Sequence, residues 1–453
     1  MSRPVSIAWL AAFRMLFGIA MCVSMLRFIV YGWIDEFFVN PPLHFKYWGF
    51  GWVDVLPRAG MHALVAILAA LALAMALGLF YRAAAALFAL GFIYLQLIDV
   101  ATYLNHYYLA SLLALLLAVA PAHGAFSLDA LRARSTRTAT VLAFWLYLFR
   151  FQIGVVYTFA GLAKAQGDWL VHAQPLRIWL GSHTDLPVLG ALFTLPGAPL
   201  VMSWMGFGFD ASVAWLLSYR RTRPFAYPIL LVFHALTGLL FPIGMFPVIM
   251  TIAALVFFPP EWPLRAAARL RRLLPFAAFP PAPATSTPLR DRRELPKTAL
   301  ALAALYCVLQ VAVPLRFLLY DGSVIWHEQG MRFSWRVMVR EKNASVTFLV
   351  REKKTGRVRH VSPRDYVTRI QEREFAAQPD LILQLAHHIR DDWERRGFGP
   401  VEVRVDAVAS LNGRRLARLI DPAVDLASVR DGLGQARFIL PSPTEPPPHT
   451  HPI

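Results

Sequence analysis

The stretch that decides the fold is Thr140-Val-Leu-Ala-Phe-Trp-Leu-Tyr-Leu-Phe-Arg150-Phe-Gln-Ile-Gly-Val-Val-Tyr157-Thr-Phe-Ala-Gly161-Leu-Ala-Lys164. It is apolar and long enough to cross a bilayer as one helix. Arg150, Tyr157 and Lys164 are spaced by seven, so they share one helix face, and Gly154 and Gly161 on that face would let another helix approach closely. A lysine at mid-bilayer costs about 2.5–3.5 kcal/mol. Lys164 therefore either snorkels to an interface or has a function, and Arg150 is expected to pair with a carboxylate or a carbonyl.

The composition is that of a polytopic membrane protein. Of 453 residues, 57% are hydrophobic and 16% are charged, and the mean hydropathy is +0.48. The formal charge of +17 is typical of basic cytoplasmic loops, so we expect a lipid bilayer and no nucleic acid among the partners. Cys22 and Cys307, the only cysteines, both lie in apolar segments, which excludes a cysteine-based zinc site and argues against a disulfide.

Apolar segments predict an α-helical bundle of about nine spans. They fall near residues 8–31, 62–81, 83–103, 106–121, 139–163, 201–218, 226–241, 243–258 and 297–318. The turn Phe241-Pro-Ile-Gly244 divides a stretch that is too long for one crossing, so a tight helical hairpin is expected there. Residues 186–200 are apolar but interrupted by prolines, which favours a re-entrant or interfacial piece over a span.

Basic loops predict the orientation. Residues 132–137, 220–223 and 265–293 are rich in arginine and should be cytoplasmic. Threading the spans through these loops places the N-terminus inside, and places residues 32–60, the 103–109 turn and everything after about residue 319 outside. The first apolar segment is too long for a signal-peptide core and carries Arg14 and Arg27, so we expect a retained span. The predicted location is an inner or plasma membrane, with an extracytoplasmic C-terminal domain.

The chain divides into five parts on this interpretation: a membrane bundle (1–264), a basic Pro-rich cytoplasmic linker (265–296), a last transmembrane helix (297–318), a small strand-rich α+β domain (319–440) and a disordered tail (441–453). Alternation predicts strands at 337–339 and 346–350, with a turn at 354–356. Residues 379–396 have the pattern of an amphipathic helix. Asn412-Gly413 between apolar runs predicts a hairpin.

Three polar clusters fall on the predicted outer side. They are the aromatic loop around His44, the turn Tyr103-Leu-Asn105-His106-Tyr-Tyr, and Ala160-Gly-Leu-Ala-Lys164 with Asp168-Trp169. An interfacial aromatic belt or a helix cap would also explain the first two. Burial disfavours the ammonium form, so a buried lysine near a histidine suits acid–base chemistry. No phosphate loop, serine elbow or metal-ligand spacing is present in the sequence, and no metal is expected.

These clusters, with Phe233-His234 before Leu240-Phe-Pro-Ile-Gly-Met-Phe-Pro247 and Pro41-Pro-Leu-His44-Phe-Lys-Tyr, resemble the vitamin K-dependent γ-glutamyl carboxylase family. Its membrane part is the horizontally transferred transmembrane (HTTM) domain. The resemblance continues through Phe333-Ser-Trp335-Arg-Val-Met-Val339, Thr355-Gly356 and Ile420-Asp-Pro-Ala-Val-Asp425, and covers about residues 8 to 430 in order.

The resemblance implies a reaction. In the family, a lysine deprotonates vitamin K hydroquinone, which reacts with O₂ to give a strong base; that base removes a glutamate γ-proton, CO₂ adds to the carbanion, and the quinone leaves as its epoxide. Lys164 matches the catalytic lysine and His106 a histidine of the carbanion step. Substrate-binding roles are implied for Asn105, Trp335, His44, His234 and Arg340, while Arg14, Arg150 and Tyr157 are expected to be structural polar groups within spans.

This sequence differs from the animal enzymes at several points, and these differences limit which properties of the family the resemblance implies. The first lysine of their paired motif is Ala163 here, the cysteines of their interdomain disulfide are missing, Arg340 replaces a histidine, and the C-terminal part is shorter. Quinol epoxidation is therefore the safer inference, and carboxylation of a glutamate-containing peptide or protein the further one. The alternatives are a non-catalytic HTTM protein that binds a lipid or peptide, and a transporter, for which no repeated pair of broken helices is present in the sequence.

Overall fold

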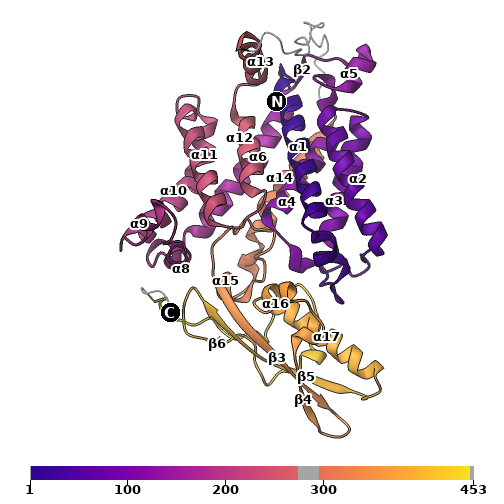
Figure 1. The fold of residues 1–453 in the computed structure, drawn as a ribbon, viewed down its shortest axis with the longest axis vertical. Helices are drawn as coiled ribbons and strands as arrows, with labels where there is room; N and C mark the ends of the chain where they lie inside the picture. The colour runs from indigo at the N-terminus through magenta and orange to yellow at the C-terminus, as the bar shows by residue number, and fades with distance from the viewer. Residues whose placement is uncertain (1, 274–294, 449–453) are drawn as a thin grey trace.

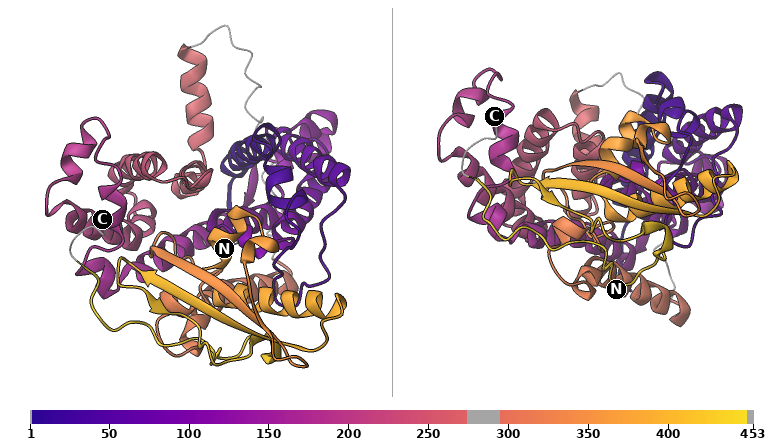
Figure 2. Two further views of the ribbon diagram at one scale, coloured as in Figure 1. Left: turned by 60° about the horizontal axis from the view of Figure 1, so that its bottom comes forward. Right: turned by 90° about the horizontal axis from the view of Figure 1, so that it is seen from below.

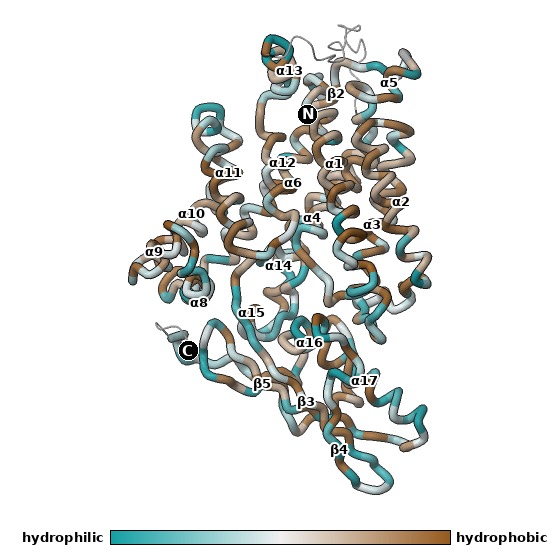
Figure 3. Tube along the Cα trace, in the orientation of Figure 1, coloured by the Kyte–Doolittle hydropathy of each residue, from teal (hydrophilic) through white to brown (hydrophobic). Residues whose placement is uncertain are grey.

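The computed structural model describes residues 2–273 and 295–448. A helical bundle forms one end of the molecule and an α+β domain forms the other (Figure 1). The apolar residues run along the bundle helices, while hydrophilic segments mark the ends of the bundle (Figure 3).

The long helices follow the predicted spans. They are α1 (Ala8–Val30), α2 (Arg58–Leu77), α3 (Tyr81–Leu97), α4 (Asn105–Val119), α6 (Ala143–Lys164), α10 (Ala198–Ser218), α11 (Arg223–Leu240), α12 (Phe246–Ala254) and α14 (Lys297–Leu315). Six helices are long and apolar enough to cross a membrane alone, and seven if α12 is counted with its bent continuation; α3 and α4 are shorter than that limit. The predicted bundle is thus confirmed, with fewer full-length spans among the described residues than the nine expected. α3 ends at Leu97 instead of near residue 103 because a 3₁₀ turn at Val100–Thr102 follows it.

Short elements connect the spans. They are β1 (Pro4–Ser6), β2 (Thr140–Leu142), α5 (Leu128–Arg132), α7 (Gly167–Leu170), α8 (Leu176–Gly181), α9 (Leu189–Phe193) and α13 (Trp262–Leu273). β1 pairs antiparallel with β2, which ties the N-terminus to the start of α6. The turn between α11 and α12 is the predicted helical hairpin, and Gly244 supplies its positive φ of 58°. The proline-interrupted stretch 186–200 holds α9 and the start of α10.

The basic loops lie at the end of the bundle opposite the C-terminal domain (Figure 1). The N-terminus, the α5–β2 segment and α13 are all at that end, as is the α10–α11 connection. This is the relative placement that the loop charges predicted.

The C-terminal domain is built on a four-stranded antiparallel sheet with the order β4-β3-β5-β6. The strands are β3 (Lys342–Glu352), β4 (Val358–Val361), β5 (Val401–Leu411) and β6 (Ala417–Arg418), and the helices are α15 (Val324–His327), α16 (Arg369–Phe375) and α17 (Pro379–Arg395). Every second residue of β5 is buried, because α17 packs its apolar side against one face of the sheet. Asn412 and Gly413 have φ of 52° and 78° and form the predicted hairpin turn, and Gly356 (φ 71°) marks the other turn.

The predicted strand at Val337–Val339 is wrong. Residues 331–341 form no strand, because Phe333, Trp335 and Met338 have φ of 60°, 58° and 52°, which breaks the extended conformation that the alternation suggested. Trp335 and Val339 are nevertheless buried, so the alternation reflects burial in an irregular segment.

The predictions for the basic linker and for the C-terminal tail need correction or fall partly outside the described residues. The basic segment expected to be a linker from residue 265 begins as a helix, α13, up to Leu273, and the Pro-rich stretch 275–287 lies outside the described residues. The tail was expected to be disordered from residue 441. Its part up to Pro448 is irregular but bound: Gln174 Nε2 donates to Pro448 O (3.1 Å), and Arg414 Nε donates to Glu445 O (2.7 Å). Cys22 and Cys307 are free.

Candidate active site

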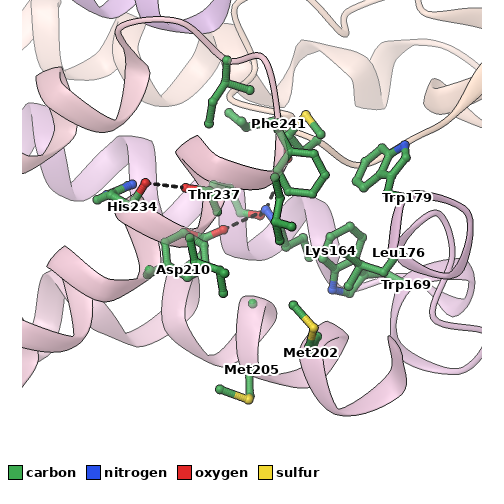
Figure 4. Close-up of a pocket in the computed structure, with 18 of the residues that line it drawn as sticks. Lys164, Trp169, Leu176, Trp179, Met202, Met205, Asp210, His234, Thr237 and Phe241 are labelled. Carbon is green, nitrogen blue, oxygen red and sulfur yellow. Dashed lines mark hydrogen bonds and ion pairs between the residues drawn. The ribbon is translucent and has the colours of Figure 1, made fainter. Parts of the chain in front are cut away.

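Lys164 forms a buried ion pair at the C-terminal end of α6. Its Nζ lies 2.7 Å from Oδ2 of Asp210 on α10, and both side chains are buried (Figure 4). Nζ also donates to Ala160 O (3.4 Å) and to Val337 O (3.3 Å), and it lies over the ring of Trp169. Lys164 thus does not snorkel to an interface; it is held by a carboxylate and two carbonyls.

A close helix crossing brings the two charges together. A Cβ at Gly161 would lie 2.8 Å from the backbone N and Cα of Ala211, so only glycine allows this approach of α6 and α10. Gly161 is one turn before Lys164, and Ala211 follows Asp210. The prediction that small residues admit another helix is confirmed at Gly161, whereas a Cβ at Gly154 would meet nothing within 4 Å.

The ion pair lines a cavity of about 570 Å³ in the bundle. The walls are mostly apolar and come from α6–α12 and the 337–338 segment; they include Trp169, Trp179, Met202, Met205, Phe233, Phe241 and Met338. Met205 and Val201, which line the cavity from α10, are also 66% and 58% exposed, so α10 contributes apolar surface as well as cavity wall. A cavity of this size and polarity suits an aromatic ligand with an apolar tail.

Tyr157 and His234 form a second polar group in the wall. The Tyr157 hydroxyl and His234 Nε2 are 2.8 Å apart, and His234 is 2% exposed. His234 Nδ1 is buried without a hydrogen-bond partner in the described structure. A buried unpaired ring nitrogen is costly, which makes Nδ1 a free contact for a polar ligand atom.

His106 and Asn105 begin α4 rather than a turn between spans. His106 is buried, and Phe246 stands between it and His234, with ring centroids 6.3 Å from His106 and 6.0 Å from His234. Asn105 Oδ1 accepts from the Tyr103 hydroxyl (3.1 Å). His106 is therefore next to the cavity wall, and neither His106 nor Asn105 lines the cavity that contains Lys164.

Trp335 lies where the C-terminal domain enters the bundle. It is fully buried and stacks on Tyr108 with centroids 4.8 Å apart. Tyr108 also contacts Phe333, whose backbone N–H donates to the Tyr103 hydroxyl (2.8 Å). This aromatic cluster fixes the segment that carries the Val337 carbonyl to Lys164.

His44 lies away from the cavity. Its Nδ1 is 3.3 Å from Oδ2 of the buried Asp99, which also accepts from Gln371 Nε2 (2.8 Å) on α16. Gln371 Nε2 donates in addition to Leu43 O (2.7 Å). In this arrangement His44 ties the aromatic loop to Asp99 of the bundle, and Gln371 joins both to the C-terminal domain.

Arg340 is part of a charged cluster in the C-terminal domain. Its guanidinium lies 2.9 Å from Glu328, which also pairs with the buried Lys342 (3.2 Å). Burial lowers the pKa of the Lys342 ammonium to about 8, although Glu328 acts in the opposite direction. Glu328 also lines a second, more polar cavity of about 740 Å³, together with Lys46, Arg332 and Asp380.

Asp168 fastens the two parts of the protein to each other. Its carboxylate accepts two hydrogen bonds from Arg414 (both 2.6 Å) and one from Asn412 Nδ2 (2.7 Å) at the β5–β6 turn. Burial tends to raise the pKa of Asp168, but these hydrogen bonds outweigh it and hold the pKa below 3.8. The Asp168 carboxylate is therefore an interdomain clamp.

Arg150, expected to pair with a carboxylate or a carbonyl, binds carbonyls, and so does Arg14. Arg150 Nε donates to Val256 O (2.8 Å) and a terminal nitrogen to Phe257 O (3.1 Å) at the end of α12. Arg14 is fully buried and donates to Ala122 O (2.8 Å). Both side chains satisfy carbonyls at helix ends that would otherwise be unpaired.

Asp210 is the site residue that sequence reasoning missed. It is the only acidic residue of α10, and an acidic residue in a span is itself a signal, because such residues are rare and paired. Within the described ranges, no group of three or more His, Cys, Asp and Glu side chains could hold a metal ion.

Comparison with known protein families covers nearly the whole chain. Residues 2–262 match the HTTM domain, and residues 295–445 match the lumenal domain of vitamin K-dependent gamma-carboxylase. No solved structure matches the chain significantly. The first match alone covers more than half of the chain, and the second begins where the last span begins. This integral membrane protein therefore belongs to the vitamin K-dependent γ-glutamyl carboxylase family, with an HTTM bundle followed by a lumenal-type α+β domain.

Proposed function

We propose that the protein is a membrane enzyme that oxidises a reduced naphthoquinone of the vitamin K type and couples this oxidation to carboxylation of glutamate. The observation that carries the proposal is the Lys164–Asp210 pair, 2.7 Å apart, in the wall of an apolar cavity. A general base that reaches a membrane quinol has to lie at bilayer depth and be reachable from an apolar space.

The cavity residues fit a reduced naphthoquinone. Trp169, Met202 and Phe241 offer apolar and aromatic walls for fused rings, and His234 Nδ1 offers a polar contact at a separate point from Lys164. Val201 and Met205 of α10 are exposed and also line the cavity, so an isoprenoid tail would lie along them. When bound, the hydroquinone supplies the reducing electrons for O₂ and, as it becomes the epoxide, the base strength for γ-proton removal.

Each residue at the pair has a distinct task. Lys164 accepts the hydroxyl proton at Nζ, which requires the neutral amine, so the proton that Nζ carries in the ion pair with Asp210 has to leave before this step. Asp210 orients Nζ and stabilises the ammonium that forms, as the third group of a catalytic triad does for its base. The Val337 carbonyl holds the amine from the side of the C-terminal domain. His106, behind Phe246, is proposed for the carbanion step on the strength of the family resemblance.

The glutamate substrate and CO₂ are proposed to arrive from the extracytoplasmic side. The cavity that contains Glu328, Lys46 and Arg332 opens between the bundle and the C-terminal domain, and its cationic side chains suit an acidic peptide. Arg340 and Trp335 flank the segment between the two cavities. The orientation in an inner or plasma membrane is tested by fusing alkaline phosphatase after Leu440, where activity is expected, and after Ser218, where none is expected.

The test is epoxide formation from vitamin K hydroquinone by detergent-purified protein. We expect epoxide from the wild type, and loss to the uncatalysed level in Lys164→Ala. Ser212→Ala is the matched control, since its hydroxyl bonds to Gly208 O within α10, and should keep wild-type activity. No epoxide from folded wild-type protein would instead favour a non-catalytic HTTM protein.

Carboxylation is tested separately. Incorporation of labelled CO₂ into glutamate-containing peptides, measured beside epoxide formation, distinguishes a coupled carboxylase from a quinol epoxidase. Epoxide without label in any acidic peptide would support the epoxidase alone.

A further inference from the structure

α13 leaves the bundle almost at a right angle. It is bent by 104° from the Phe246–Phe257 segment, after Pro259 and Pro260. Figure 2 (left) shows it projecting sideways from the bundle, and Figure 1 places it at the end that carries the basic loops. A helix turned so far from a span runs along the membrane surface instead of across it.

The sequence of α13 fits a surface position and excludes a continued span. It contains four arginines in 12 residues, and none of its residues is buried in the protein. A single arginine at mid-bilayer costs about 2.5–3.5 kcal/mol, so four cannot enter the core. The bend therefore marks the point at which the chain leaves the hydrocarbon layer.

The two sides of α13 differ in chemistry. At 100° per residue, Trp262, Ala266, Leu270 and Leu273 fall on one side. Arg271 and Arg272 fall on the other side, with Leu264 between them, while Arg265 and Arg269 lie at one edge of the apolar side. Leu270 is 40% exposed and Leu273 is 76% exposed, so the apolar side is not covered by the rest of the described protein. A short helix with an apolar side and an arginine side is the pattern of interfacial membrane-binding helices.

We propose that α13 is a binding site for anionic phospholipid head groups in the leaflet on the side of the basic loops. Its apolar side sits among the upper acyl chains, while the guanidinium groups of Arg265, Arg269 and Arg272 pair with lipid phosphates, which Arg binds in a bidentate way. Charge selects the occupant: neutral lipids offer the apolar contact alone, whereas anionic lipids add an attraction at each cation near the surface. This inference does not depend on the proposed enzymatic activity.

The experiment uses two spin labels that leave every arginine in place. In a full-length background with Cys22→Ala and Cys307→Ala, Ala266→Cys labels the apolar side and Ala268→Cys the arginine side; both alanines are exposed. In liposomes with phosphatidylglycerol, we expect the Ala266→Cys label to be several-fold more accessible to O₂ than to a water-soluble nickel complex, and the Ala268→Cys label to show the reverse. The contrast should shrink in phosphatidylcholine alone and at high salt.

A charge-matched pair of variants tests the arginines. Arg265→Gln, Arg269→Gln and Arg272→Gln together should remove the dependence on phosphatidylglycerol. Lys353→Gln, Lys354→Gln and Arg357→Gln, which remove the same charge from the β3–β4 turn at the far end of the molecule, should keep it. The proposal is overturned if both labels are accessible to water in both kinds of liposome. It is also overturned if the difference in accessibility between the two labels is the same with and without anionic lipid, in which case α13 is embedded in lipid without selectivity for the head group.

Discussion

Replacement of Asp210 by asparagine tests the ion pair at the centre of the proposed site. The change keeps the shape of the side chain and removes its charge, so Lys164 loses its counter-charge and keeps only neutral acceptors: the weaker amide oxygen at position 210 and the carbonyls of Ala160 and Val337, at 3.4 and 3.3 Å. Both contacts are longer than the 2.7 Å contact to Asp210 and do not fix the amine in one direction. We therefore expect a misplaced base whose ammonium form has lost its counter-charge.

The size of the effect follows from these contacts. A misplacement of a catalytic group by about 1 Å costs roughly 10²-fold in rate, or about 2.7 kcal/mol. Epoxide formation by Asp210→Asn should fall by about that factor while the KM for the hydroquinone changes little. A purely structural Asp210 would lower the yield of folded protein and leave the kcat of the folded fraction unchanged.

A double-mutant cycle separates folding from catalysis. Asp210→Leu alone leaves a buried ammonium unpaired and should cost about 3–5 kcal/mol of stability, whereas Asp210→Leu with Lys164→Met replaces the whole pair by apolar groups and should recover most of that loss. Thermal unfolding in detergent measures both. Equal destabilisation in the single and double variants, or wild-type epoxidation by Asp210→Asn, would refute the reasoning.

Three further outcomes are expected. Gly161→Val should destabilise the α6–α10 crossing by about 1–3 kcal/mol or more through overpacking, while Gly154→Val, where nothing lies within 4 Å, should be tolerated; thermal stability in detergent compares them. Tyr157→Phe should cost about 1–3 kcal/mol because it leaves His234 Nε2 unpaired, with His234→Phe in the same background recovering part of the loss in the same assay. Asp168→Asn should weaken the contacts of Asp168 with Asn412 and Arg414, and amide exchange in the β5–β6 turn should therefore become faster. Glu402→Gln, on β5, should leave the exchange in this turn unchanged. The folded pKa of Asp168 lies below its ordinary value of 3.8, so its contribution is complete above that value and is lost as the pH falls through the folded pKa.

The bundle could be predicted from the sequence because the hydropathy of a segment is enough to identify a membrane helix. The α11–α12 hairpin and the Asn412-Gly413 turn were predictable for a local reason: Gly244 and Gly413 supply positive φ where the chain reverses. The conformation of the segment 333–339 could not be predicted, because its alternation comes from burial between two domains. No local sequence feature indicates that Trp335 has a left-handed conformation.

The site could be predicted only in part. Lys164 was found because a lysine in an apolar segment is costly, and the same argument applied to Asp210 would have found its partner. The distance between them depends on the Gly161–Ala211 contact, which sequence spacing does not give. His44 and Asp168 stand in motifs beside the predicted site, yet the structure pairs His44 with Asp99 and pairs Asp168 with Arg414 of the C-terminal domain.

The contact from Val337 to Lys164 imposes an order on biogenesis. The amine belongs to the fifth long helix to be synthesised, and the carbonyl that holds it belongs to a segment that follows the last one. A ribosome must therefore complete the bundle, and the translocation machinery must move the start of the C-terminal domain across the membrane, before the lysine acquires its full set of acceptors. Until then Lys164 can have only its acceptors within the bundle, Ala160 O and the Asp210 carboxylate.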